Sequence, residues 1–254
     1  MRKISEAIDN MASWLFLFIL GGICCLYFKI SNRTKVTGFS KNLRKERGII
    51  FYSNHLTMLD PFLILTVIYY PWSLLRLSLL PYIAADGRNF ATSELISQAP
   101  FFGRFLDNNF GAWLMKKMAK YSHCVLVRRN ERGERKDSRV LWEMIRLLRQ
   151  GKNLLIFPEG TRSRSGQIYL FQFGLAELTS IKGIKVKLVP VYISGIEKCL
   201  PIGYWRPRCG KKIKIIFGQQ FNLEDLEGYS KEKRKDRIWI TTQLRQKLIE
   251  LSSL

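Results

Sequence analysis

The sequence predicts an α/β fold in which a mostly parallel sheet is flanked by helices. Two observations support this. Short apolar runs typical of buried strands alternate with helical patterns along most of the chain. In addition, the 254 residues, 47% of them hydrophobic, are enough to build one domain around a large core. Strands that alternate with helices pair in parallel, because each helix returns the chain to the edge of the sheet where the previous strand began.

The expected strands are short, apolar and separated by helices or turns. They cover residues 48–53, 124–127, 153–157, 187–193 and 212–217. Helices are expected at residues 61–70, 136–149, 173–181 and 231–251. In residues 136–149 the apolar side chains recur at positions that share one side of a helix, which predicts an amphipathic helix on the surface of the sheet. A basic linker is expected at residues 32–47.

The N-terminal segment is the most apolar part of the chain. Residues 12–30 contain one charge, Lys29, and as a helix they would extend about 28 Å, close to the thickness of the hydrocarbon core. Basic residues are more frequent after this segment than before it, which places the following domain in the cytoplasm. We therefore expect a membrane-associated helix at residues 1–31 and a catalytic domain at residues 32–254. Gly21 and Gly22 lie within the segment, so a helix lying in the membrane interface is the alternative to one that spans it.

The charge balance indicates a negatively charged partner. Lysine and arginine number 42 against 20 acidic residues, which gives a formal net charge of +22. Nucleic acid and an anionic membrane surface both fit such a charge. The apolar N-terminal segment favours the membrane, so no nucleic acid is expected as a partner. Five cysteines without a CxxC pair and only two histidines argue against a zinc site, and no metal is expected.

The first candidate motif is residues 54–60, NHLTMLD, directly after an expected strand. Open α/β sheets place their sites at the C-terminal ends of strands. Asp60 precedes Pro61, an order typical of a helix start, which predicts that Asp60 caps the helix. The short loop also allows its carboxylate to fold back onto the imidazole of His55. A carboxylate on one ring nitrogen would fix the tautomer, and the other nitrogen could then take a proton from an alcohol.

The second candidate motif is residues 157–163, FPEGTRS, at the end of another expected strand. Gly160 permits a tight turn with accessible amides, Thr161 supplies a hydroxyl, and Arg162 supplies a planar guanidinium suited to phosphate. Such a cluster is typical of a phosphate site. An ordinary polar turn on a basic protein is the alternative.

Four segments in order resemble the motifs of the glycerolipid acyltransferase family. NHLTMLD resembles its first block, NHxxxxD, and CVLVRRN resembles the second, with Arg128 at the arginine position. LIFPEGTRS resembles the third block throughout, and LVPVYI resembles the fourth, with Pro190 at the proline position. The resemblance extends over residues 36–223. It implies a membrane-bound enzyme that transfers an acyl group to a lysophospholipid.

The resemblance also implies roles for individual residues. His55 would be the general base that activates the lysolipid hydroxyl, with Asp60 orienting it, and the hydroxyl would attack the acyl thioester directly. The acceptor, most simply 1-acylglycerol 3-phosphate, would be converted to phosphatidate. No cofactor is implied beyond the co-substrate, acyl-CoA or acyl carrier protein. The residues implied for acceptor binding are Arg128, Glu159, Gly160, Thr161, Arg162 and Pro190.

Two departures from the family pattern leave the acceptor open. The family usually carries a lysine near the position of Thr92 or Ser93 and another at that of Gln172. Fewer cations favour an acceptor with less headgroup charge, such as another lysolipid or an aminolipid. A non-catalytic basic protein that binds a membrane or nucleic acid is a further alternative, based on charge alone. The chain has no GxSxG motif, so a serine hydrolase is not expected.

Overall fold

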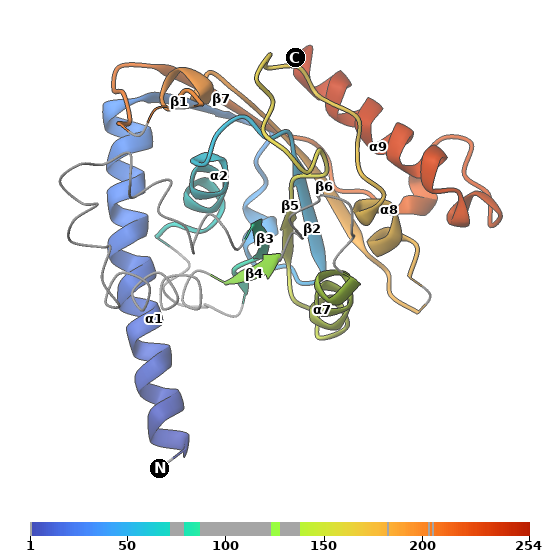
Figure 1. Ribbon diagram of the computed structural model, residues 1–254, viewed down its shortest axis with the longest axis horizontal. Coiled ribbons are helices and arrows are strands. Elements are labelled where there is room, and N and C mark those ends of the chain that lie inside the picture. The colour runs from blue at the N-terminus through green and yellow to red at the C-terminus, as the bar shows by residue number, and fades with distance from the viewer. Residues whose placement is uncertain are drawn as a thin grey trace.

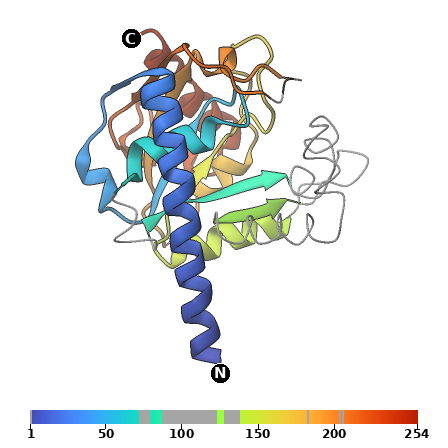
Figure 2. The ribbon, with the colours of Figure 1, turned by 90° about the vertical axis from the view of Figure 1, so that its left-hand side faces the viewer.

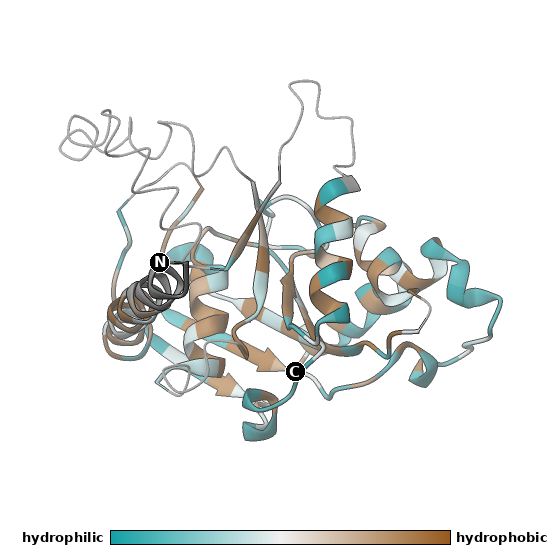
Figure 3. Cartoon of the chain, turned by 90° about the horizontal axis from the view of Figure 1, so that it is seen from below, coloured by the Kyte–Doolittle hydropathy of each residue, from teal (hydrophilic) through white to brown (hydrophobic). Residues whose placement is uncertain are grey.

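The computed structural model describes residues 2–71, 79–86, 123–127, 138–181, 183–202, 204 and 206–254. Within these residues the centre of the fold is a seven-stranded sheet in the order β1-β7-β6-β2-β5-β3-β4. The strands are β1 Arg33–Thr37, β2 Ile49–Ser53, β3 Tyr82–Asp86, β4 Cys124–Val127, β5 Leu154–Ile156, β6 Lys187–Ser194 and β7 Lys212–Phe217. All neighbouring pairs are parallel except β6 and β7, so the expected mostly parallel sheet is confirmed. Apolar residues dominate the central strands (Figure 3), and every residue of β2 and β5 is buried.

Helices cover both faces of the sheet (Figure 1). The helices α1 Arg2–Cys25 and α2 Asp60–Tyr69 lie on one face, and α1 continues into the π-helical segment η1 Leu26–Ser31. The helices α7 Ser138–Arg149, α8 Gly174–Thr179 and α9 Arg237–Ser252 lie on the other face. Each face has its own hydrophobic core, because alternate residues of a strand point to opposite sides. The short 3₁₀ segments are η2 Lys41–Arg44, η5 Ile196–Lys198, η6 Leu223–Asp225 and η7 Lys233–Lys235.

Most expected elements are present, and three differences have a physical cause. The expected linker at residues 32–47 contains β1, a basic edge strand that pairs only with β7. The strand β3 was not expected, because its two alanines and its aspartate are uncommon in strands. The last helix begins at Arg237 instead of residue 231, because the Asp236 carboxylate caps it by accepting from the amides of Ile238 and Trp239, both at 3.0 Å.

The connections of β2 and β5 make their C-terminal ends a topological switch point, the place where open α/β sheets form a ligand crevice. These strands are parallel neighbours in the sheet. The chain leaves β2 for α2 on the α1 face, whereas it leaves β5 for α8 on the α9 face. Neighbouring strands whose connections depart to opposite faces leave open space between them, which is where open α/β sheets bind ligands.

The expected N-terminal helix is present and packs along α2. At Gly21 the aromatic ring of Tyr70 approaches so closely that an added Cβ would lie 2.7 Å from the ring carbon Cδ2. The N-terminal end of α1 projects beyond the domain (Figure 2). Within the described residues, no helix combines the length and apolar character needed to cross a membrane. The expected helix over residues 12–30 is thus confirmed as a helix, and the expectation that it spans a bilayer is not.

Candidate active site

The first motif lies where β2 ends, and Asn54 fixes its start. The Asn54 side-chain amide donates to the carbonyl of Ile193 at 2.8 Å, and its oxygen accepts from the amide of Ile193 at 2.9 Å. This paired bond continues the ladder between β2 and β6 one step beyond the last strand residue. The backbone that carries His55 is therefore anchored to the sheet.

The carboxylate of Asp60 is the centre of the turn that follows. It is fully buried and accepts four hydrogen bonds. The donors are His55 Nδ1 at 2.8 Å, the Leu56 amide at 2.6 Å, the Thr57 amide at 2.9 Å and the Thr57 hydroxyl at 3.1 Å. The expectation that Asp60 caps α2 is wrong. Asp60 is already the first helical residue, Leu59 occupies the cap position, and the carboxylate points back into the loop.

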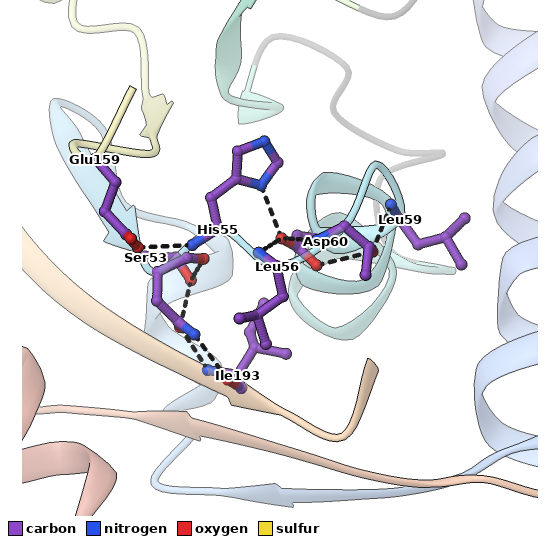
Figure 4. A network of polar contacts seen from close by, with 9 residues as sticks. Ser53, His55, Leu56, Leu59, Asp60, Glu159 and Ile193 are labelled. Carbon is purple, nitrogen blue, oxygen red and sulfur yellow. Dashed lines mark hydrogen bonds and ion pairs between the residues drawn. The ribbon is translucent and has the colours of Figure 1, made fainter. Parts of the chain in front are cut away.

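The imidazole of His55 is held on two sides. Its ring stacks on that of Phe157 with centroids 4.4 Å apart, and Nδ1 contacts Asp60. About a fifth of the side chain is exposed, at 20%. The other ring nitrogen points away from Asp60 (Figure 4). A histidine held in this way can present one free nitrogen to a ligand in the crevice.

Glu159 joins the two motifs. Its side chain is 3% exposed, and its oxygens accept from the His55 amide at 2.9 Å and from the Tyr169 amide at 3.0 Å. A second link runs the other way, because the Ser163 amide donates to the His55 carbonyl at 2.7 Å. Burial raises the pKa of Glu159 above its ordinary value, while the two amides act in the opposite direction. Glu159 is thus a positioning residue that ties the second motif to the backbone of His55.

The tip of the second motif, residues 160–162, is exposed or half-buried. Gly160 adopts a positive φ of 68°, which only glycine reaches without strain, and Thr161 is exposed. Arg162 is half-buried and makes no hydrogen bond or ion pair to any described residue. Its guanidinium is therefore available to an anion beside His55. Across the residues that the structure describes, no three or more His, Cys, Asp or Glu side chains gather in a way that could hold a metal ion.

One expected site residue, Pro190, lies elsewhere, and another is not described. Arg128 falls outside the described residues. Pro190 is buried in β6, and its ring packs against Gly218 and lies on the side of the sheet covered by α9. A Cβ added to Gly218 would lie 2.5 Å from Pro190 Cγ. No hydrogen bond or ring contact joins Pro190 to His55 or Asp60 among the described residues.

Several residues that support the site carry no catalytic signature in the sequence. Asn54 and Thr57 lie inside the first motif, and their polar character was the only signal. Tyr169 and Arg245 gave none. The Arg245 guanidinium, from α9, donates to the carbonyls of Tyr169 at 3.0 Å and Ile168 at 2.8 Å. Arg245, near the end of the sequence, therefore stabilises the loop at residues 168–169, which Glu159 also contacts.

The fold and part of the sequence are similar to those of known acyltransferases. The family model described as Acyltransferase matches residues 93–194, a range that includes the second motif and Pro190. A Dictyostelium discoideum protein named Taffazin is 25% identical over 222 residues, which are 83% of this chain and 70% of that protein. The crystal structure of the 1-acyl-sn-glycerophosphate (LPA) acyltransferase PlsC from Thermotoga maritima has the same fold, with a TM-score of 0.54 and 20% identity, and covers 100% of both chains.

The chain is therefore similar to acyltransferases in part of its sequence and in its fold, in line with the resemblance of its four motifs to the glycerolipid acyltransferase family.

Replacing Glu159 with Gln tests the link between the motifs. The variant keeps the shape of the side chain but turns an amide NH₂ toward a backbone N–H, either that of His55 or that of Tyr169. We expect the free energy of unfolding to fall by about 1–3 kcal/mol, because a buried donor loses its acceptor. We expect kcat to fall roughly 10-fold or more, because His55 loses its position. Chemical denaturation and steady-state kinetics measure the two effects.

The matched control is Glu227→Gln, which removes a carboxylate from an exposed position. Both quantities should stay at the wild-type values in the control. Wild-type stability and kcat in Glu159→Gln would show that Glu159 does not hold the two motifs together.

Proposed function

We propose that the protein transfers a fatty acyl group from an acyl thioester to the free hydroxyl of a lysophospholipid, foremost 1-acylglycerol 3-phosphate, to give phosphatidate. The observation that carries this proposal is the His55–Asp60 pair at 2.8 Å, whose second ring nitrogen points away from Asp60 (Figure 4), next to the turn whose Ser163 amide donates to the His55 carbonyl. The solved structure that shares the fold is that of an enzyme titled a 1-acyl-sn-glycerophosphate acyltransferase. The segments that carry the proposed base and the proposed anion-binding arginine are in backbone contact, as an acceptor with a hydroxyl and a phosphate requires.

The reaction needs one proton transfer and one displacement. The Asp60 carboxylate accepts from Nδ1–H, so the second nitrogen of His55 takes the proton of the acceptor hydroxyl as its oxygen attacks the thioester carbonyl. The new C–O ester bond forms, the C–S bond breaks, and the thiolate leaves. The protonated imidazole then returns its proton to the sulfur. No acyl-enzyme, metal or cofactor takes part in this scheme.

The acceptor phosphate binds at the second motif in this proposal. Arg162 has no partner among the described residues, and a guanidinium binds phosphate with two parallel hydrogen bonds. Thr161 in the same turn is exposed, so its hydroxyl is accessible to solvent. The resemblance assigns a second arginine, Arg128, to the same phosphate.

The domain at residues 32–254 would work on a membrane surface, with residues 1–31 as its attachment helix. One side of α1 and η1 is apolar and more than half exposed at every third or fourth position. Its members are Met11, Leu15, Ile19, Ile23, Leu26 and Ile30. Such a stripe is typical of a helix lying in the membrane interface, and the basic residues that follow add attraction to anionic lipid. By the same charge bias the catalytic domain would face the cytoplasm.

A second candidate acceptor is a lysolipid with less headgroup charge, or an aminolipid. Gln172 favours it, because its side chain lies against the turn: a Cβ added to Gly160 would be 3.2 Å from Gln172 Cγ. A neutral amide therefore stands next to the expected phosphate site where a lysine is usual in the family. An amide contributes no charge to a doubly ionised phosphate.

Replacing His55 with Ala tests the base. We expect kcat/KM for acyl transfer to fall by about 10²–10⁴-fold, the usual contribution of a general base. Radiolabelled acyl transfer to lysolipid in detergent or vesicles measures it. His123→Asn is the matched control, because it removes the only other histidine and because Asn tolerates the φ of 55° at that position. Activity near wild type in His55→Ala would remove His55 from the role of base.

A panel of acceptors tests the headgroup. For the wild type we expect the highest kcat/KM with 1-acylglycerol 3-phosphate among lysolipids that differ only in headgroup. In Gln172→Lys we expect the preference for the phosphate monoester to rise by up to about 5-fold, which corresponds to one exposed ion pair. A wild type that prefers a zwitterionic or amino headgroup would favour the second candidate.

Replacing Leu15, Ile19 and Ile23 together with Ser tests the membrane helix. We expect binding to anionic vesicles to weaken by at least 10-fold in a sedimentation assay, because three buried apolar side chains are lost from the interface. The control replaces Ile238, on α9, and Leu254, after its end, with Ser. These side chains are 68% and 78% exposed, and vesicle binding should stay at the wild-type level. Equal vesicle binding by the triple variant and wild type would contradict the proposed attachment.

A further inference from the structure

Four cations stand in two facing pairs on the strands β1 and β7. In the parallel register Arg33 lies opposite Lys212, and Lys35 lies opposite Lys214. Facing residues of a parallel pair, and residues two apart on one strand, point to the same side of the sheet. The four side chains therefore share one side, with about 5 Å between the strands and about 7 Å along them. We call this set of four residues the cation ladder.

The cation ladder is not neutralised within the described chain. Arg33, Lys35 and Lys212 are exposed and Lys214 is half-buried, and none of the four forms an ion pair with a described residue. Like charges directly opposite each other on neighbouring strands are destabilising. Such an arrangement is stabilised when a multivalent anion binds across it.

The cation ladder lies at the same edge of the sheet as His55. Lys214 pairs with Ser194, the last residue of β6, and the preceding Ile193 is the residue that Asn54 holds beside the catalytic motif. The strands β7 and β1 are the second and third neighbours of β2, so in the plane of the sheet they lie about 10 and 14 Å from it. The His55 turn belongs to the α2 face and the cation ladder to the α9 face, so a ligand with one end at His55 and phosphates at the cation ladder would cross this edge from one face to the other.

The cation ladder and the proposed membrane surface lie on opposite faces of the sheet. On β7 the alternate residues Ile213, Ile215 and Phe217 pack into the core beneath α2, whereas Ile216 packs into the core beneath α9. Lys212 and Lys214 share the side of Ile216. The apolar stripe of α1 lies on the opposite face (Figure 1). The cation ladder thus faces away from the lipid, toward ligands that arrive from water.

We propose that the cation ladder binds the phosphates of the nucleotide part of an acyl-CoA donor. This inference rests on the proposed function, which places the thioester at His55. Acyl-CoA carries a diphosphate and a 3′-phosphate on a ribose, joined to the thioester by the long pantetheine arm, so its phosphates fall at a distance from the reacting carbonyl. The four cations of the ladder are close enough together to contact that cluster of phosphates. The hydroxyl of Ser194, next to Lys214, adds a neutral donor at the inner end.

The test uses the full-length double variant Lys212→Gln/Lys214→Gln and the inert probe adenosine 3′,5′-bisphosphate. By titration calorimetry we expect the wild type to bind the probe and the variant to bind it at least 10-fold more weakly. Kinetically, KM for acyl-CoA should rise at least 10-fold with little change in kcat, and the rise should shrink with a donor made from 3′-dephospho-CoA. The control Lys231→Gln/Lys235→Gln removes the same charge from exposed positions and should match the wild type.

His55→Ala separates the two proposals. Probe binding by His55→Ala at the wild-type level supports the cation ladder even if acyl transfer is not the reaction. Equal probe binding by Lys212→Gln/Lys214→Gln and wild type would overturn it. Loss of binding to anionic vesicles alone in this variant would also overturn the proposal, because it would assign the cation ladder to lipid. Loss of activity with acyl carrier protein alone would overturn it as well, because it would assign the cation ladder to a protein donor.

Discussion

The buried carboxylate of Asp60 is the interaction on which the site depends. A charged group with no exposure is strongly destabilising unless it is hydrogen-bonded. Asp60 meets that requirement with two backbone amides, one hydroxyl and the His55 ring. Because three of its four donors belong to the turn itself, the carboxylate fixes the backbone and the histidine tautomer together. The imidazole is thereby oriented before any substrate binds.

The sheet supplies the second constraint. It fixes the position of the turn at residues 54–60 relative to the turn at residues 157–163. Since β2 and β5 are neighbours, the loops that follow them emerge side by side. Glu159 then crosses from one loop to the other, and α9 braces the far loop through Arg245. The proposed base follows one strand and the proposed anion-binding arginine follows its neighbour, and contacts to the backbone hold the two segments together. The topology thus brings together segments about a hundred residues apart.

The sequence was informative where a local pattern determines the outcome. Alternating apolar runs predicted β2, β5, β6 and α7, and the two motifs predicted that His55 and Arg162 lie at strand ends. It was less informative where the partner is distant. Nothing local identifies Tyr169 or Arg245 as supports, because their role depends on loops brought together by the fold. The cap assignment of Asp60 failed because the loop offered its carboxylate more donors than the helix end did.

The tautomer of His55 is the most direct measure of the central claim. With ¹⁵N-labelled histidine in the His123→Asn variant, His55 gives the only histidine signals in the NMR spectrum. At a pH where the ring is neutral we predict a proton on Nδ1, where Asp60 accepts it, and an unprotonated Nε2. In Asp60→Asn this preference should be lost. A neutral ring protonated at Nε2 in the presence of Asp60 would contradict the role of His55 as a base held ready by that carboxylate.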